Sequence, residues 1–414
     1  MFKKLFTQIK NEWRSNLWLA LEMLIVSVVL WYVVDFFYVT IYNYTLPRGF
    51  DASNCYRIGV ATLTDKSPEY IADRSNEETF KDREALLDRI RMRPEVEFVS
   101  LSINAYPYNG SNNVTSILLY DTIYPQGFAV SRDVTPDFVQ VFRYEGVRGE
   151  TPAQLAEMLT KGEVLISDNL FMHDKIKGVD IVGEGLSLFG DTTRTYRIGA
   201  SLNEVQYDDY GGWGDDFTMV YSSSTSLQWG QEWCVRVKEG HTKDFIENFM
   251  NDADKLYRVG NLYITDVKSF DNIRDNFQRI TTNEIRNYCV GMGFLLLNIF
   301  LGLLGTFWFR TQQRVGEIAI RMVNGATRRS VFGRLIGEGL LLLSIVTVLA
   351  AVIDVLIAHL ELNQWLNGAY MSWGRTTACI LIAYVLMAIM ISVGIAFPAY
   401  RAMHIEPTEA LHDE

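Results

Sequence analysis

Four long apolar windows dominate the pattern of hydrophobic and polar positions along the chain, at residues 17–41, 287–309, 339–358 and 376–400. The second and fourth hold no charged residue over 23 and 25 positions. A helix of about 20 such residues crosses the roughly 30 Å hydrocarbon core of a bilayer. The pattern therefore predicts four transmembrane helices, with buried helices of a globular protein as the alternative.

Three acidic residues interrupt the first and third windows: Glu22, Asp35 and Asp354. Charges within a membrane are usually functional. Each of the three is close to the end of a predicted span, however, and long side chains reach the interface from such positions. We therefore expect an interfacial or snorkelling position for each.

Basic residues next to the spans predict the orientation. Four precede the first window, and six arginines lie in residues 310–338. Because basic residues near span ends stay inside, both termini and residues 310–338 are expected to be cytoplasmic, with residues 42–286 outside. The basic inner face suits contact with anionic membrane lipids.

The external segment is acidic. The whole chain has 38 Lys and Arg against 49 Asp and Glu, a net charge of −11, and the stretch from Tyr42 to Phe309 alone has 26 against 38. This argues against nucleic acid as a partner. Cys55 and Cys234 lie in this segment and could pair in an oxidising compartment, although we expect them to be unpaired.

The external segment mixes two periodicities. Alternating patterns predict strands at residues 96–105, 162–167, 194–202, 218–223 and 232–237. Helical spacing predicts helices at residues 76–94, 151–162 and 243–257. The prediction is a large α+β domain between the first and second spans. Its acidic run at residues 207–216 lacks the spacing of a calcium loop and is interpreted as a solvated Gly-rich loop, with a partner contact as the alternative.

Two further helical patterns flank the spans. Residues 1–16 predict an amphipathic helix in the inner headgroup layer. An apolar ridge that begins at Phe270 runs without a helix breaker through the second span to Val323. At 1.5 Å per residue, an unbroken helix of this length would reach about 80 Å.

Catalytic and metal-binding patterns are not found in the sequence. The five histidines are scattered, and neither HExxH nor CxxC spacing occurs. GxSxG and GxxxxGK[ST] do not occur either. We expect no catalytic, cofactor or metal residues, and no ATP site in this chain.

The arginine-rich segment 310–338 predicts two helices joined by a tight turn. Asn324 and Gly325 are typical of a helix C-cap, and Thr327 of the next N-cap. Arg328 and Arg329 then fall in a first turn, where cations oppose the helix dipole. We expect them to serve anionic headgroups or an acidic groove of a partner, and not helix stability.

The pattern of this segment resembles the cytoplasmic loop of the MacB/FtsX-type ABC transporter permeases, and residues 398–414 resemble the end of the same family. Parts of the external segment are similar to the MacB-type periplasmic domain. The resemblance is carried by Arg314, residues 316–318, residues 320–321, residues 325–329 and Glu338. Among these, it implies that the following contact the ATPase: Arg314, Glu317, Arg321, Gly325, Ala326, Arg328, Arg329 and Glu338.

The resemblance implies a permease subunit of the bacterial inner membrane that is driven by a separate cytoplasmic ABC ATPase. It implies a second permease copy or paralogue as a dimer partner, and export of drugs, peptides or other periplasmic substrates, with a periplasmic adaptor and an outer-membrane channel as possible partners. A lipoprotein-releasing permease is an alternative within the family. A membrane sensor or receptor, or an intramembrane enzyme, is an alternative from another class.

The expected order of parts follows from these patterns. They are a cytoplasmic amphipathic helix (1–16), a first span (17–41), a periplasmic α+β domain with stalk (42–286), a second span (287–309), a cytoplasmic coupling loop (310–338), a third span (339–358), a short periplasmic loop (359–375), a fourth span (376–400) and a cytoplasmic tail (401–414).

Overall fold

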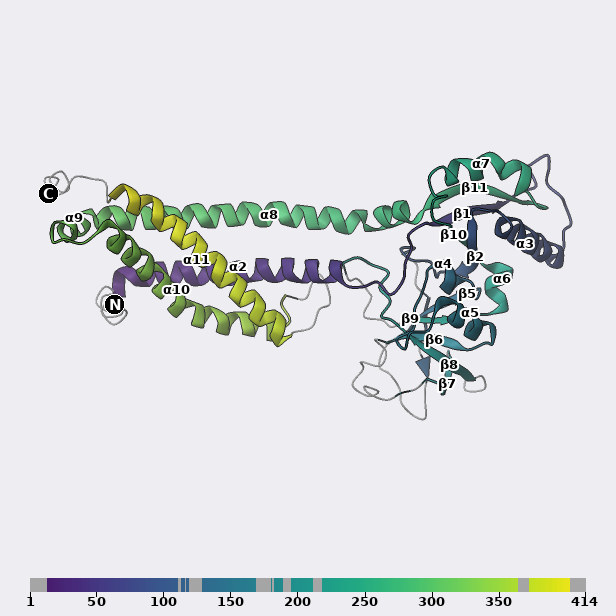
Figure 1. Ribbon diagram of the computed structural model, residues 1–414, viewed down its shortest axis with the longest axis horizontal. Helices are drawn as coiled ribbons and strands as arrows, with labels where there is room; N and C mark the ends of the chain where they lie inside the picture. Colours follow the sequence, from purple (N-terminus) through teal and green to yellow (C-terminus); the bar gives the residue numbers. More distant parts are fainter. Residues whose placement is uncertain are drawn as a thin grey trace. The chain divides into compact units, whose positions relative to one another are not determined.

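The computed structural model describes the chain except residues 1–12, 111–112, 116, 119–128, 169–179, 181, 189–194, 211–217, 364–371 and 403–414. It divides into two compact units (Figure 1). One unit, Leu46–Thr281, is called the sheet unit below. The other combines Met1–Thr45 with Thr282–Glu414 and is called the membrane unit. Most of the amphipathic helix expected at 1–16 and of the tail expected at 401–414 lies outside the described residues.

Within its described residues, the sheet unit contains one eleven-stranded mixed sheet of order β11-β1-β10-β2-β5-β9-β6-β8-β7-β4, with β3 paired to β5. The pairs β5/β9 and β6/β8 are parallel, and the other pairs are antiparallel. The strands are β1 (Cys55–Thr62), β2 (Val96–Ile103), β3 (Asn113–Thr115), β4 (Ile117–Leu118), β5 (Ala129–Val134), β6 (Val164–Ser167), β7 (Gly185–Leu188), β8 (Thr195–Leu202), β9 (Thr218–Tyr221), β10 (Glu232–Val237) and β11 (Leu262–Ser269).

Helices cover both faces of this sheet: α3 (Asn76–Arg91), α4 (Phe138–Val141), α5 (Pro152–Thr160), α6 (Ser224–Trp229) and α7 (Phe245–Leu256). Side chains on β10 alternate between two cores, as a pleated strand requires. Trp233 and Val235 pack with α3 and α7, whereas Cys234 packs with α4 and α5. The predicted α+β domain between the first two spans is therefore confirmed.

All eight predicted elements of the domain are present, but eight others were not predicted: β1, β3, β4, β5, β7, β11, α4 and α6. The strand β1 lies inside the sheet, between β10 and β11. Its apolar residues Tyr56, Ile58 and Val60 alternate with Arg57, Gly59 and Ala61. A period-two signal was therefore present in the sequence and was missed.

Cys55 and Cys234 are free, buried thiols on neighbouring strands. Cys55 pairs with Arg236, and Arg57 pairs with Cys234, so the two thiols are diagonal neighbours. Such positions are separated by about 7–8 Å, at the limit beyond which a disulfide needs backbone movement. Burial raises the pKa of Cys55 to about 12, which keeps this thiol in its unreactive protonated form.

The interpretation of residues 207–216 as a solvated loop is wrong at Asp209. Only 4% of this residue is exposed, and its carboxylate forms ion pairs with Arg48 and Arg274. Residues 211–217 lie outside the described part of the chain. Asp209 is thus a buried structural anion of the sheet unit.

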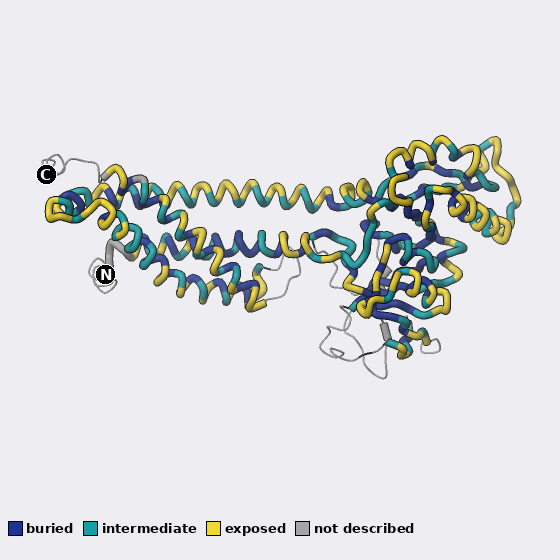
Figure 2. Tube along the Cα trace, viewed as in Figure 1, coloured by how far each residue is buried: buried dark blue, intermediate teal, exposed yellow. Residues whose placement is uncertain are grey.

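The membrane unit is built from α2 (Trp13–Thr45), most of α8 (Phe270–Gln313), α9 (Val315–Val323), α10 (Arg328–His359) and α11 (Trp373–Ala402). Among the described residues, α2, α8, α10 and α11 are long and apolar enough to cross a membrane. Their burial differs: 44% of the apolar window of α2 is buried, but only 11% of that of α8 (Figure 2). Exposed Val290, Phe294 and Leu297 leave α8 with a broad open apolar surface.

Asp35 does not snorkel outward, whereas the alternative of an interfacial position stays a prediction. Its side chain is 2% exposed and accepts two hydrogen bonds from Arg375, of 2.7 and 2.5 Å, and one of 2.7 Å from Asn363. Asp354 is also buried, at 3% exposure. Both carboxylates therefore lie among packed helices of the membrane unit, whereas Glu22 is half-buried and accepts from Thr306.

The expected unbroken helix from Phe270 to Val323 is also wrong. Helix α8 ends at Gln313, and Arg314 has a non-helical φ of −107° before α9 begins. The 44 residues of α8 correspond to about 66 Å at 1.5 Å per residue. The break separates the span from the coupling loop.

Candidate functional site

The coupling loop, residues 310–338, is a helical hairpin. The last turn of α8 leads through Arg314 into α9, and a tight turn leads into α10, whose first eleven residues complete the segment. Arg314 donates its backbone N–H to the carbonyl of Thr311 at 3.1 Å, which closes the end of α8. The segment thus consists of three consecutive helical pieces and two breaks.

The turn between α9 and α10 has the caps that the sequence predicted. Ala326 N–H bonds the Arg321 carbonyl, and Gly325 N–H bonds the Met322 carbonyl, both at 3.0 Å. This is a Schellman motif, and its C′ residue needs a positive φ; Gly325 provides it at +89°. Thr327 then accepts the N–H of Ser330 at 3.3 Å as the N-cap of α10.

Four of the predicted site residues form a chain of ion pairs inside the hairpin. Arg314 contacts Glu317 at 3.1 Å and Glu338 at 2.7 Å. Glu317 also contacts Arg321 at 2.6 Å, and Glu338 contacts Arg334 at 3.1 Å. The alternation Arg321–Glu317–Arg314–Glu338–Arg334 therefore connects α9 to α10 through the arginine at the break.

The electrostatics of Glu317 follow from this chain. Partial burial alone would raise its pKa, but the charge of Arg314 and the hydrogen bonds from Arg321 and Arg314 outweigh burial and lower the pKa. Glu317 is consequently ionised at neutral pH, as its two arginine contacts require.

Apolar side chains close the inner face of the hairpin. Ile318 on α9 packs against Val331 on α10, and both are at most 5% exposed. Val315, Met322, Ala326, Phe332 and Leu335 pack around them. With this core and the ion pairs, α9 is held against the start of α10.

The outer face of the hairpin carries a different set of side chains. Ile320 is 52% exposed and Val323 is 64% exposed. Arg328 and Arg329 are exposed in the first turn of α10; no ion pair involving either is seen within the described part of the chain. Two aliphatic residues and two arginines, called the outer face below, thus lie around the turn. The sequence had predicted only the arginines.

The predicted site residues therefore fall into three groups. Arg314, Glu317, Arg321 and Glu338 pair with one another, Gly325 and Ala326 form the turn, and Arg328 and Arg329 lie on the outer face. Sequence analysis missed Arg334, although its i,i+4 spacing to Glu338 was a signal. It assigned no site role to Ile320 or Val323, because apolar residues of this kind are usually buried.

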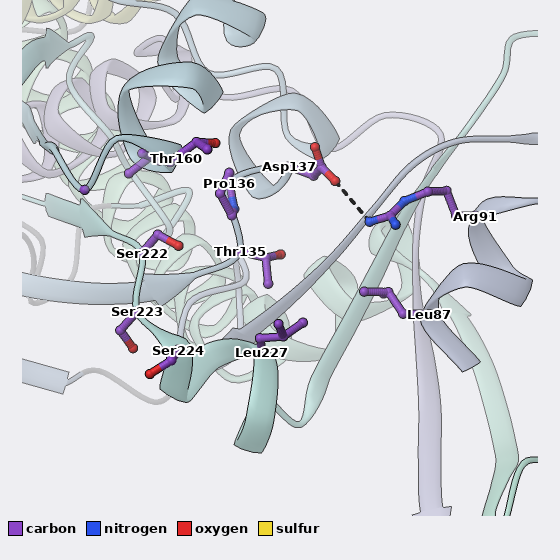
Figure 3. Close-up of a pocket in the computed structure, with 12 residues that line it drawn as sticks. Leu87, Arg91, Thr135, Pro136, Asp137, Thr160, Ser222, Ser223, Ser224 and Leu227 are labelled. Carbon is purple, nitrogen blue, oxygen red and sulfur yellow. Dashed lines mark hydrogen bonds and ion pairs between the residues drawn. The ribbon is translucent and has the colours of Figure 1, made fainter. Parts of the chain in front are cut away.

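A separate cleft of about 410 Å³ lies in the sheet unit (Figure 3). Thr135 and Ser222 follow the carboxyl ends of the parallel strands β5 and β9, where clefts in open α/β sheets commonly form. Arg91 and Asp137 pair across it at 3.4 Å. Leucines form its apolar part, and no His, Cys or Lys is among its described lining residues: Leu87, Arg91, Thr135, Pro136, Asp137, Leu159, Thr160, Gly162, Ser222, Ser223, Ser224 and Leu227.

Among the described residues there is no cluster of three or more His, Cys, Asp or Glu side chains that could hold a metal ion. The described part of the coupling loop presents exposed aliphatic and cationic side chains around its turn.

Comparison with known proteins places the coupling loop in a named domain. Residues 290–407 match the family model of the FtsX-like permease C-terminal domain. This range includes the end of α8 and the whole of α9, the turn, α10 and α11. No curated protein sequence matches the chain.

Two solved structures are similar to part of the chain at 10% identity. The periplasmic region of MacB from Actinobacillus actinomycetemcomitans covers 56% of this chain and 95% of its own length, with a TM-score of 0.31. The extracellular domain of the noncanonic ABC-type transporter YknZ from Gram-positive bacteria covers 51% of this chain and 100% of its own length, with a TM-score of 0.30. At such scores no property of either is transferred to this chain. Residues 290–407 are thus similar to an FtsX-like permease C-terminal domain, and they contain the end of α8 together with α10 and α11, three of the four helices long and apolar enough to cross a membrane among the described residues.

Proposed function

We propose that this permease converts ATP hydrolysis by a separate cytoplasmic ABC ATPase into movement of its sheet unit, and so drives export of periplasmic drugs, peptides or other substrates. The outer face of the coupling loop is the docking surface for that ATPase. The observation that carries this proposal is the division of the loop into an inner face of paired charges and an outer face of exposed ones.

Helix stability does not explain the outer face. Arg328 and Arg329 occupy the first turn of α10, where a cation opposes the helix dipole by about 0.3–1 kcal/mol each. Ile320 and Val323 expose aliphatic surface beside them. Apolar side chains with arginines around them are typical of interface centres, and they fit a partner groove with an apolar floor and acidic walls.

The inner face gives the docking surface its rigidity. The ion-pair chain and the Ile318–Val331 contact hold α9 on α10. A force applied at the turn would therefore reach α10 directly, and α8 through Arg314. Small displacements are transmitted by such packed elements and not absorbed by them.

Further parts of the proposal concern the assembly. The open apolar surface of α8 supports pairing with a second copy or a paralogue within the bacterial inner membrane. The arginines of the coupling loop support cytoplasmic termini and a periplasmic sheet unit. A periplasmic adaptor and an outer-membrane channel would complete the export route.

The test is affinity purification of the full chain from native membranes with quantitative mass spectrometry. An ABC ATPase should co-purify with the wild type, and the double variant R328E/R329E should recover at least about tenfold less of it, because like-charge contacts at an interface cost several kcal/mol. The control is R148E/K161E, which reverses two exposed charges of the sheet unit. Undiminished ATPase recovery with R328E/R329E would contradict the docking assignment.

A further inference from the structure

Asp209 binds two arginines, Arg48 near the first residue of the sheet unit and Arg274 near its last residue in the sequence. Its side chain is 5% exposed, and its two carboxylate oxygens are shared between the partners. Oδ1 contacts Nη1 of Arg48, and Oδ2 accepts from Nε of Arg274 at 2.7 Å. The Tyr108 hydroxyl donates to Oδ1 at 3.4 Å, so the buried anion is surrounded by donors.

The two arginines mark where the chain enters and leaves the sheet unit. Arg48 lies three residues beyond the end of α2, and Arg274 is the fifth residue of α8. Asp209 itself follows β8, which ends at Leu202. The Asp209 carboxylate therefore connects three segments: the one that follows α2, the first turns of α8, and the one that follows β8.

Backbone contacts hold the entering segment against the same part of the chain. Gln206 N–H bonds the carbonyl of Arg48 at 3.1 Å. Gly49 has a φ of +70°, and a Cβ at this position would lie 2.1 Å from the Glu204 carbonyl oxygen. Only glycine permits this approach, so residues 48–49 and 204–206 are in direct backbone contact.

Aromatic packing holds the start of α8 at the same place. The Phe277 ring lies 6.1 Å from that of Tyr108, and the buried Phe270 ring lies 5.0 Å from that of Phe142. Tyr108 thus touches Asp209 with its hydroxyl and α8 with its ring. The polar and apolar contacts around Asp209 form one connected group.

We propose that Asp209, with Arg48 and Arg274, is the joint that locks the two ends of the sheet unit together and passes displacement of α8 into β8 and the sheet. Asp209 is a positioning residue in this role. The transmission part rests on the function proposed above, whereas the locking part concerns the sheet unit alone. A buried carboxylate shared by two cations suits locking, because the loss of Asp209 leaves two arginines close together without their common anion.

The joint is tested by hydrogen exchange with mass spectrometry on the full chain in lipid nanodiscs, first without nucleotide. Asp209→Asn should raise exchange about tenfold or more in residues 46–54 and 270–281 together, since hydrogen bonds to charged groups are lost at both. Helix α7 should stay unchanged. Arg274→Gln should raise exchange only in residues 270–281. Glu157→Gln, at an exposed ion pair, is the control and should alter neither segment.

The second measurement adds ATP to the chain together with its co-purified ATPase. In the wild type, ATP should change exchange in β8, and Asp209→Asn should abolish this response while ATPase recovery stays normal. The joint is refuted if Asp209→Asn leaves both ends unchanged, loosens α7 equally, or keeps the ATP response. If the wild type recovers no ATPase or shows no ATP response, the proposed function is contradicted. The exchange pattern measured without nucleotide then tests the locking role of Asp209 by itself.

Discussion

The coupling loop and the Asp209 joint are both built from arginines and carboxylates, but they differ in burial and in sequence separation. The loop carboxylates of Glu317 and Glu338 are 39% and 14% exposed and bind arginines in consecutive helices. The Asp209 carboxylate is 5% exposed, and Arg274 is 65 positions away from it. The loop pairs shape one local hairpin, whereas the joint connects distant parts of a domain.

This difference in burial indicates how much each cluster of ion pairs contributes to folding stability. Partly exposed ion pairs contribute about 0–1 kcal/mol each, so the loop chain orients α9 more than it stabilises it. A buried charge that loses its partner costs about 3–5 kcal/mol. The loss of stability caused by a mutation should therefore increase with burial of the ion pair. The largest loss is expected for the buried pair of Asp35 and Arg375 in the membrane unit.

The largest effect is expected at Asp35 and Arg375, whose side chains are 2% and 9% exposed. Arg375→Met leaves the Asp35 carboxylate uncompensated and should destabilise the membrane unit by about 3–5 kcal/mol. The double variant D35L/R375M removes both charges and should recover most of this loss. Thermal unfolding of the purified protein in detergent measures both. A single variant as stable as the wild type would contradict the ranking by burial.

A smaller effect is expected within the coupling loop. In the chain of ion pairs, Glu338 is the carboxylate that connects α10 to Arg314. Glu338→Gln removes this charge and should lower the free energy of local opening of α9 by about 1 kcal/mol. Glu317→Gln removes contacts only to residues three and four positions away, and should cost about 0.2–0.5 kcal/mol. Local hydrogen exchange in α9 gives the two values. Equal effects would show that the contact to α10 adds nothing.

The same contrast explains how much could be predicted from the sequence. The turn residues Asn324, Gly325 and Thr327 and the local spacing of Arg314 and Glu317 are short-range features, and the structure confirms the caps. The Arg314–Glu338 contact spans 24 positions and was not predicted as a pair. Asp209 was taken for a solvated residue because its partners are brought to it by the folded sheet. The pairing of Asp35 with Arg375 was not predicted because it spans 340 positions.

The smallest effect is a pH dependence in the coupling loop. The pKa of Glu317 is lowered in the folded chain because the arginines outweigh burial. Its contribution is therefore present above the unfolded pKa of about 4.3 and is lost as the pH falls through the lower folded value. Protection of α9 in the wild type should exceed that in Glu317→Gln by a constant amount from pH 5 to 8, and the excess should shrink as the pH falls below the unfolded pKa and vanish below the folded pKa. A difference that persists at low pH would show that the charge of Glu317 is not its cause.

The central claim is that the outer face of the hairpin docks the ATPase while the inner face does not. Ile318 and Ile320 are two residues apart on α9, and they are 3% and 52% exposed. A photo-crosslinking amino acid placed at each position in native membranes compares the two faces directly. The account predicts a crosslink from position 320 to a cytoplasmic ABC ATPase, and crosslinks from position 318 only within the permease. Equal crosslinking of the ATPase from both positions, or none from position 320, would contradict it.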